Sequence, residues 1–213
     1  MQFAAHIGAR VLVYHAGRFI AEETFPVNGT HKISAEEQTN LLGVEQEYLR
    51  LLADEYSGIV ICVENARPYL HHSPYCYAED LDALRNQVEA VNRPNVRINL
   101  DIGHWHMAAR FYGLDLVAPV RRCKGLFAHT HIHDNFGGVV YHYEKMQTHQ
   151  LPFGRGDSHM PVGWGTIPLD AILGAYLSGY GGALLMELRS RYFEKTEESM
   201  ANLKLLLSGL ELS

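Results

Sequence analysis

The sequence has few cysteines, and they form no pair of the kind that binds metal or carries out redox chemistry. Cys62, Cys76 and Cys123 are widely separated and make no C-x-x-C motif. A disulfide framework needs an even set of cysteines in a small chain, and a thiolate zinc site needs closely spaced pairs. We therefore expect three reduced thiols with a structural role.

Long apolar runs and an excess of positive charge are also absent. No stretch reaches the roughly 18 apolar residues that a membrane span needs, and the start, "MQFAAHIGAR", lacks the pattern of a signal peptide. Lys and Arg number 18 against 24 Asp and Glu, so the formal net charge is −6. This balance disfavours broad electrostatic binding to nucleic acid, although it leaves a local basic patch open. We expect a cytoplasmic protein that does not contact a membrane.

What the chain does contain is the composition of an ordinary globular protein. Of its 213 residues, 47% are hydrophobic and 20% are charged, which is enough to bury a substantial core. Residues 1–213 show no linker, low-complexity tract or short repeat, so we expect a single domain. Histidine is unusually frequent, with 13 residues. Bound metal or proton transfer would explain that number, but so would scattered surface histidines.

Five short apolar runs alternate with helix-like segments. The apolar runs cover residues 10–17, 58–65, 96–103, 125–134 and 182–189. The helix-like segments cover residues 34–56, 78–92, about 107–122, 167–180 and 194–210. Ser34 and Glu37 have the spacing of a capping box at the start of the first such segment. The alternation predicts an α/β protein with a parallel sheet that is buried on both faces.

Each predicted strand ends on a residue that can bind a metal ion or transfer a proton. These residues are His15, Glu64, Asp101, His131 and Glu187. The carboxyl ends of parallel strands meet at one face, so we expect these side chains to converge. Taken singly, each acid has a simple explanation as a helix cap or loop residue, and each histidine as a hydrogen-bonded structural residue. Three acids buried together, however, are costly unless a cation neutralises them.

The last four of these residues offer three carboxylates and one imidazole, a set that suits manganese, cobalt, zinc or magnesium. Other motif residues stand near them in the sequence. His104 follows Asp101 by three residues, and Asp157 and His159 form a D-x-H pair. Taken alone, the D-x-H pair is most simply explained as surface residues. Together with His15 and His104, it is a candidate for a second metal site or for a site that binds substrate hydroxyls or phosphate.

The heptapeptide "HTHIHDN" carries three histidines at alternate positions. Because side chains alternate along a strand, His129, His131 and His133 share one side of it. We expect His131 to be the ligand and His129 to lie deeper, as a hydrogen-bonded core residue. His133, past the end of the strand, is expected to orient a ligand or to contact substrate.

The motifs H-A-G, E-N, D-I-G-H, H-I-H-D-N, D-S-H-M-P-V-G-W-G and M-E-L follow one another between about residue 10 and residue 190. In this order they resemble the xylose isomerase-like TIM-barrel superfamily, which holds sugar phosphate isomerases and epimerases together with endonuclease IV-type phosphodiesterases. The resemblance implies a (β/α) barrel, and a complete barrel has eight strands. We therefore expect an N-terminally truncated barrel with about five of the eight strand–helix units, which leaves open a homo-oligomer or a partner that completes it.

The resemblance also implies roles for particular residues. The shared metal site would consist of Glu64, Asp101, His131 and Glu187. In the isomerases and epimerases, the metal polarises a carbonyl or hydroxyl oxygen, and the two glutamates remove and return the adjacent proton. His104 would contact a substrate oxygen, and Arg189 would bind a distal hydroxyl or phosphate.

The favoured function is a metal-dependent isomerase or epimerase that acts on a sugar or a sugar phosphate. The first rival is an endonuclease IV-like phosphodiesterase, in which His15 contributes to one extra zinc ion and His104, Asp157 and His159 contribute to another. An inactive truncated barrel, and a dehydratase or lyase that uses the same site, complete the set of candidate functions. Net acidity and the lack of a basic, aromatic-rich stretch favour the isomerase or epimerase.

Overall fold

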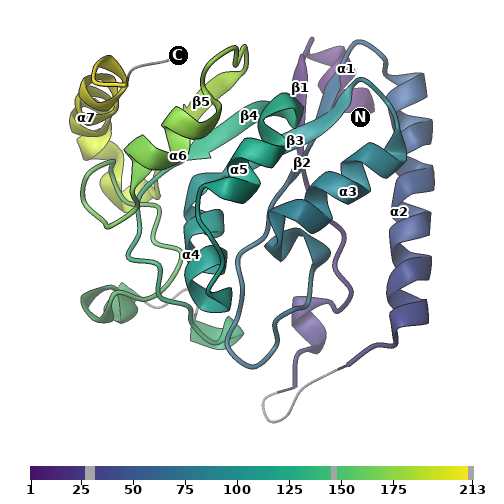
Figure 1. Ribbon diagram of the computed structural model, residues 1–213, viewed down its shortest axis with the longest axis horizontal. Coiled ribbons are helices and arrows are strands. Elements are labelled where there is room, and N and C mark those ends of the chain that lie inside the picture. The colour runs from purple at the N-terminus through teal and green to yellow at the C-terminus, as the bar shows by residue number, and fades with distance from the viewer. Residues whose placement is uncertain (27–31, 145–147, 211–213) are drawn as a thin grey trace.

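The computed structural model describes residues 1–26, 32–144 and 148–210. Within these ranges, five strands form one parallel sheet in the order β1-β2-β3-β4-β5. The strands are β1 (Val11–His15), β2 (Val60–Glu64), β3 (Val96–Asp101), β4 (Phe127–Ile132) and β5 (Ala183–Met186). Each strand lies beside the next one in the sequence, which is the order of a β/α barrel wall (Figure 1). The predicted α/β class is confirmed.

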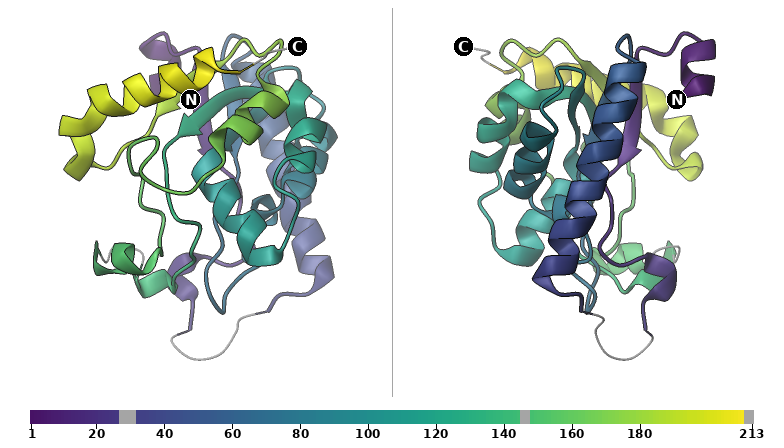
Figure 2. Two further views of the ribbon diagram at one scale, coloured as in Figure 1. Left: turned by 60° about the vertical axis from the view of Figure 1, so that its left-hand side comes forward. Right: turned by 90° about the vertical axis from the view of Figure 1, so that its right-hand side faces the viewer.

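The helices of the described residues are α1 (Gln2–His6), α2 (Ala35–Glu55), α3 (Leu81–Val91), α4 (Ile102–Tyr112), α5 (Ala118–Cys123), α6 (Leu169–Tyr176) and α7 (Thr196–Ser208). Helices α2 to α6 connect successive strands, whereas α1 precedes the first strand and α7 follows the last. The long helix α2 runs beside β1 at one end of the fold, and α7 lies at the other end (Figures 1 and 2). Among the described residues, no helix combines the length and the apolar character needed to cross a membrane.

The start of α2 shows how a local sequence signal sets a boundary. The hydroxyl oxygen of Ser34 accepts a hydrogen bond from the Glu37 N–H at 3.2 Å, and the Glu37 carboxylate accepts one from the Ser34 N–H at 2.8 Å. This reciprocal pair satisfies two donors that the first turn of a helix leaves free. The predicted capping box is confirmed.

The segment between β3 and β4 differs from the prediction. We expected a strand to residue 103 and a single helix from about 107 to 122, whereas α4 begins at Ile102 and a separate α5 follows. The helix begins early because the Asp101 carboxylate caps it, accepting a hydrogen bond from the His104 N–H at 2.7 Å. It ends at Gly113, whose φ of +66° is readily adopted only by glycine, and Pro119 opens the next helix.

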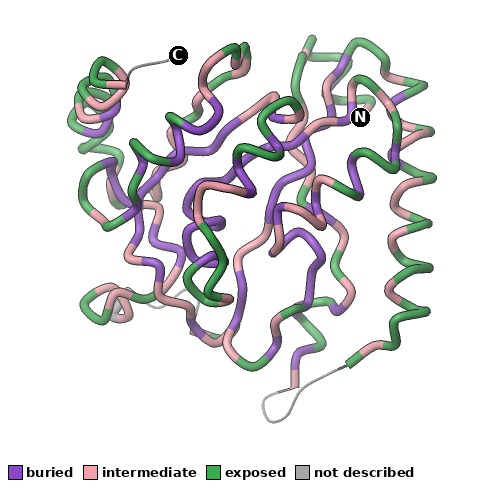
Figure 3. Tube along the Cα trace, viewed as in Figure 1, coloured by how far each residue is buried: buried purple, intermediate pink, exposed green. Residues whose placement is uncertain are grey.

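The hydrophobic core lies against the central strands. Side chains such as Ile98, Leu100 and Trp105 are almost completely buried, and Figure 3 shows buried positions concentrated in the middle of the fold. The edge strands are more open, because Val11 of β1 is 36% exposed and Leu185 of β5 is 48% exposed. The buried centre of the sheet therefore carries Glu64 and Asp101 at the ends of β2 and β3.

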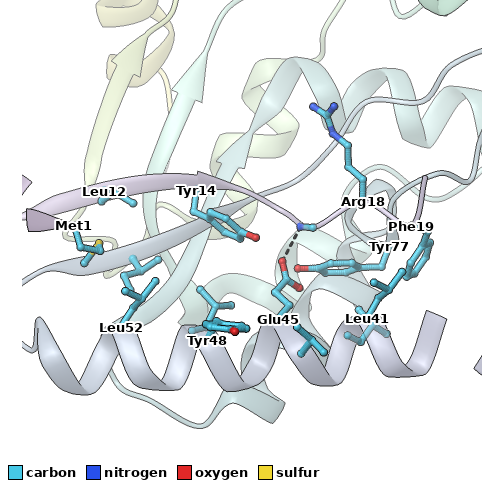
Figure 4. Close-up of a pocket in the computed structure, with 15 residues that line it drawn as sticks. Met1, Leu12, Tyr14, Arg18, Phe19, Leu41, Glu45, Tyr48, Leu52 and Tyr77 are labelled. Atoms are coloured by element: carbon cyan, nitrogen blue, oxygen red, sulfur yellow. Dashed lines mark hydrogen bonds between the residues drawn. The ribbon is translucent and has the colours of Figure 1, made fainter. Parts of the chain in front are cut away.

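A cavity of about 510 Å³ lies between β1 and α2 (Figure 4). It is lined mainly by apolar and aromatic side chains, including Leu12 and Tyr14, and the Gly17 N–H donates to Oε1 of Glu45 at its edge at 2.6 Å. Side chains alternate along a strand, so Leu12 and Tyr14 face away from His15. This apolar cavity is therefore separate from the strand-end residues.

The three cysteines are buried and free, as predicted. Burial raises the pKa of the Cys62 thiol and that of the Cys76 thiol to about 12. Both thiols are therefore protonated near neutral pH, which fits a packing role rather than a nucleophilic one.

Candidate functional site

Four strand-end residues meet at one place, as expected from the parallel sheet. Asp101 and His131 are partners in the register of β3 and β4, and the Glu187 N–H donates to the Ile132 carbonyl at 3.0 Å. Each of the four residues offers one ligand atom, and these atoms all lie within 4.8 Å of one another. We call Glu64, Asp101, His131 and Glu187 the first set.

The centre of the first set is Nδ1 of His131. It lies 2.7 Å from Oε1 of Glu64, 3.0 Å from Oε2 of Glu187 and 3.8 Å from Oδ2 of Asp101. None of these contacts has the direction of a hydrogen bond, and Nδ1 has no hydrogen-bond partner among the described residues. A buried nitrogen without a hydrogen-bond partner, close to three carboxylate oxygens, is a donor set that suits a divalent ion. The residues of the first set fit such an ion.

The charges of the first set are strongly coupled. Burial opposes ionisation of Glu64, but the nearby His131 and His15 imidazoles outweigh it and lower the pKa of Glu64 to about 2. Burial likewise disfavours the charged form of His131, but Glu187 and Glu64 raise its pKa to about 10. The carboxylates are therefore ionised at neutral pH and provide a concentration of negative charge for a cation.

Other side chains hold these ligands in place. Nδ2 of Asn99 donates to Oε1 of Glu64 at 2.9 Å, and Nε2 of His133 lies 3.1 Å from Oδ1 of Asp101. Gly103 makes room for His133, since a Cβ at this position would lie 2.0 Å from the His133 ring. The orienting role expected of His133 agrees with this contact. Asn99 was not singled out in the sequence, although its place two residues before Asp101 puts it on the same side of β3.

His129 differs from the expectation of a hydrogen-bonded core residue. It is only half-buried, and its Nδ1 has no hydrogen-bond partner among the described residues. Burial lowers its pKa, and the neighbouring His131 adds to that effect. The direction of the His129 side chain was predicted correctly, but the sheet around it is too open to bury the whole ring.

His15 joins the first set rather than a second one. Its Nε2 lies 3.0 Å from Oε2 of Glu64, and its side chain is 75% exposed. The hydrogen bond to Glu64 raises the pKa of His15, against the effect of burial. The structure therefore does not bring His15 into the group formed by His104, Asp157 and His159.

Those three residues do come together, and we call them the second set. Oδ2 of Asp157 lies 2.9 Å from Nε2 of His159 and 3.3 Å from Nε2 of His104. Nδ1 of His159 donates to the Glu187 carbonyl at 2.7 Å, which joins the second set to the first. Within the described residues, the two sets are thus neighbours in one strand-end site.

Arg67 is a member of this site that sequence reasoning missed. Its Nη1 lies 3.3 Å from Oδ2 of Asp157 and 3.3 Å from Nε2 of His104, and its Nη2 donates to the Tyr69 hydroxyl at 3.0 Å. The one signal in the sequence is its position three residues after Glu64, in the loop that leaves β2. The guanidinium thus places a positive charge next to the Asp157 carboxylate and the His104 imidazole.

Arg189 supports the backbone of the site. Its Nε and Nη2 donate to the Asp157 carbonyl at 3.2 and 2.7 Å. The contact fixes the loop that carries Asp157 and His159. The expected binding of a distal hydroxyl or phosphate by Arg189 stays a prediction.

A polar cavity of about 280 Å³ opens beside Glu64 and His104. Its wall includes two guanidinium groups, and both are paired: Nη1 of Arg18 lies 2.9 Å from Oε1 of Glu22, and Arg67 contacts Asp157. A small polar molecule in this cavity would lie next to the first set.

Comparison with solved structures shows the same fold. A D-tagatose 3-epimerase-like protein is 21% identical with a TM-score of 0.69, and the match covers 97% of this chain and 65% of that one. A xylose isomerase domain protein from Alicyclobacillus acidocaldarius is 21% identical with a TM-score of 0.62, covering 97% and 67%. The 3-keto-D-glucoside 4-epimerase from E. coli is 18% identical with a TM-score of 0.62, covering 96% and 66%. The chain thus spans about two thirds of the length of these structures.

Comparison by sequence agrees with the fold. A search of curated proteins found no match. The family model described as xylose isomerase-like TIM barrel matches residues 1–208, nearly the whole chain. The strand order and the length of this match lead to one conclusion: the chain belongs to the xylose isomerase-like TIM-barrel family.

Proposed function

We propose that this chain acts as a metal-dependent isomerase or epimerase on a sugar or a sugar phosphate. The observation that carries the proposal is the approach of two glutamates to one imidazole nitrogen, with Glu64 at 2.7 Å and Glu187 at 3.0 Å from Nδ1 of His131. Two carboxylates around one small volume are what a proton-removal and proton-return reaction needs. Structures with the same fold that are described as sugar epimerases support the choice of substrate class.

The first set would hold the metal ion, which we expect to be manganese, cobalt, zinc or magnesium. Three carboxylates and one imidazole suit these divalent ions better than copper or an iron–sulfur cluster. When bound, such an ion supplies Lewis acidity that polarises a carbonyl or hydroxyl oxygen of the sugar.

The glutamates of the chain carry out the proton transfers in this proposal. One carboxylate removes the proton from the carbon next to the carbonyl, and the electron pair of that C–H bond moves toward the carbonyl oxygen. The other carboxylate returns a proton either to the opposite face of the same carbon, or to the neighbouring carbon while the hydroxyl proton of the first carbon moves to the former carbonyl oxygen. The first outcome is epimerisation and the second is isomerisation.

The contacts of the two glutamates give them different freedom. Glu64 is almost completely buried and is held by Asn99 and His15, whereas the Glu187 side chain is 44% exposed. The pKa of each side chain lies below its usual value, so both are ionised at neutral pH and each can accept a proton. We assign Glu64 as the fixed carboxylate and Glu187 as the one that adjusts to the substrate.

Exchange of substrate hydrogen with solvent tests this function. The purified protein, loaded with Mn²⁺ or Co²⁺, is incubated in D₂O with a panel of ketoses and ketose phosphates, beside an abasic-site DNA duplex. We expect deuterium next to the carbonyl of at least one sugar, loss of the exchange after chelation, and no DNA cleavage. Cleavage of the DNA without exchange into any sugar would contradict the proposal and favour the phosphodiesterase.

A matched pair of variants assigns the exchange to the site. Glu187→Gln removes the carboxylate that approaches His131 and is expected to slow exchange by about 10²- to 10⁴-fold, the usual contribution of a general base. Glu198→Gln alters a carboxylate that accepts a hydrogen bond from Trp164 on the surface and should leave the exchange unchanged. Equal rates in the two variants would rule out Glu187 as a proton carrier.

A further inference from the structure

We propose that the guanidinium of Arg67 is a built-in cation of the second set and takes the place of a second metal ion. The chain would then bind one divalent ion, in the first set. The inference goes beyond the proposed function, because that function assigns no role to His104, Asp157 and His159. It also bears on the rival phosphodiesterase, which needs a further ion at these residues.

The second set is built like a metal site. Nδ1 of His104 donates to the Asn65 carbonyl at 3.0 Å, and Nδ1 of His159 donates to the Glu187 carbonyl at 2.7 Å. A histidine that binds a metal commonly donates its other ring N–H to such a carbonyl. Both rings therefore present Nε2 to Oδ2 of Asp157, at 3.3 and 2.9 Å.

Arg67 already stands against these ligand atoms. Its Nη1 lies 3.3 Å from Oδ2 of Asp157 and 3.3 Å from Nε2 of His104. Metal ions bind such nitrogen and oxygen atoms at about 2.0 to 2.2 Å, so an ion on these two atoms would lie within about 5.5 Å of Nη1. Two like charges at that separation, in a largely buried site, repel each other strongly.

The electron pair of His104 is also in use. Since Nδ1 carries the ring hydrogen toward Asn65, Nε2 of the neutral ring can accept a hydrogen bond from Nη1 of Arg67. If the ring is protonated, Nε2 instead donates to Oδ2 of Asp157. Neither state leaves an electron pair for a metal ion while Arg67 is in place.

The position of Arg67 is fixed by further contacts. Its Nη2 donates to the Tyr69 hydroxyl at 3.0 Å, and that hydroxyl donates to Oε2 of Glu22 at 3.1 Å. The guanidinium lies 5.4 Å from the centre of the Tyr69 ring, and the side chain is only 23% exposed. These contacts hold the guanidinium against the second set and oppose its movement into solvent.

In the part of the chain that the structure describes, the first set has no arginine or lysine among its ion-pair partners. Among the described residues, the ion pairs of Glu64, Asp101 and Glu187 are all with histidines. Histidine can lose its proton and become a ligand, whereas arginine stays charged. The two sets thus differ: a metal ion can replace the proton of His131 in the first set, whereas the charge of Arg67 in the second set is permanent.

Counting bound Co²⁺ tests the inference. After equilibrium dialysis of the whole chain against Co²⁺ and elemental analysis, we expect one ion per chain. Arg67→Met keeps much of the side-chain length but removes the charge, and we expect it to bind one ion more than the unaltered chain. Arg67→Lys keeps the charge and should bind no additional ion. The matched control is Arg93→Met, which removes a guanidinium that pairs with Asp54 on the surface and should not change the count.

Three results would overturn the inference. The first is that the unaltered chain binds two ions and loses one of them in His159→Gln. The second is an unchanged ion count in a folded Arg67→Met protein. The third is an additional ion in Arg67→Lys. If Arg67→Met does not fold, His159→Gln in the otherwise unaltered chain decides: an unchanged count supports the inference that the second set holds no ion, and a lower count overturns it. A count of zero that rises to one in Arg67→Met would contradict the proposed first-set metal and still support the role of Arg67.

Discussion

Nδ1 of His131 lies 2.7 Å from Oε1 of Glu64 without forming a hydrogen bond to it. A close contact between a potential donor and an ionised acceptor normally adopts hydrogen-bond geometry. Here the ring nitrogen and the three carboxylate oxygens instead lie within 4.8 Å of one another. The relationship is expected if the positions of these side chains are set by the ion that they bind.

Metal ions should stabilise the fold through the first set. Adding Mn²⁺ at 100 times its dissociation constant is expected to raise the free energy of unfolding by about 2.7 kcal/mol, because the ion binds the folded chain. His131→Gln removes one of the four ligands and should abolish most of this gain. Thermal unfolding with and without a chelator measures the effect, and an equal gain in the His131→Gln protein would show that the ion binds elsewhere.

Asn99 should control the affinity for the metal without contacting it. Its Nδ2 donates to Oε1 of Glu64, so Asn99→Ala frees that carboxylate to rotate. Loss of such a supporting hydrogen bond usually weakens metal binding by about 10- to 100-fold. Asn86→Ala, at an exposed position on α3, is the control. Calorimetric titration with Mn²⁺ would reveal equal affinities for the two variants if Asn99 had no positioning role.

Gly103 should be intolerant of a side chain. An added Cβ would meet the His133 ring at 2.0 Å, so Gly103→Ala must displace that ring from Asp101. We expect a loss of about 1 to 3 kcal/mol, the usual cost of overpacking. Gly43→Ala in α2 is the control: no atom lies within 4 Å of its added Cβ, and it should stabilise the helix by about 0.5 to 1 kcal/mol. Urea denaturation compares them, and similar stabilities would refute the steric argument.

The ion pair between Asp82 and Arg122 should contribute to stability only above acidic pH. The hydrogen bond from Arg122 is the largest cause that lowers the pKa of Asp82. A lowered pKa in the folded chain means that the contribution is present above the pKa of the unfolded chain and is lost as pH falls through the folded value. Since both side chains are partly exposed, Asp82→Asn should cost less than about 1 kcal/mol at pH 7. This account would be contradicted if Asp82→Asn still lowered the free energy of unfolding at pH values below the folded-state pKa of Asp82.

Much of the candidate site could be predicted because its signals are local. Glu64, Asp101 and Glu187 each follow a short apolar run, and parallel strands bring such ends together. The same reasoning failed at the start of α4. Asp101 ends a strand and caps a helix at once, whereas the sequence pattern suggested that the strand continued.

The role of Arg67 could not be predicted, because it depends on contacts across the fold. Its charge has a role only because it contacts Asp157, which lies in a loop far along the chain. The sequence pattern around residue 67 does not predict this contact. Sequence periodicity locates the elements, but the pairing of charges between loops is decided by the three-dimensional arrangement.

Asp101 belongs to the first set and also caps α4, and this combination affects how the site binds an ion. Its carboxylate accepts a hydrogen bond from the first turn of α4, so its rotamer is fixed by the same bond that starts the helix. A side chain that is ordered by folding loses no further conformational entropy when a ligand arrives. Asp101, the most buried residue of the first set, therefore keeps its position when a ligand binds. The more exposed Glu187 is the residue that adjusts to each bound molecule.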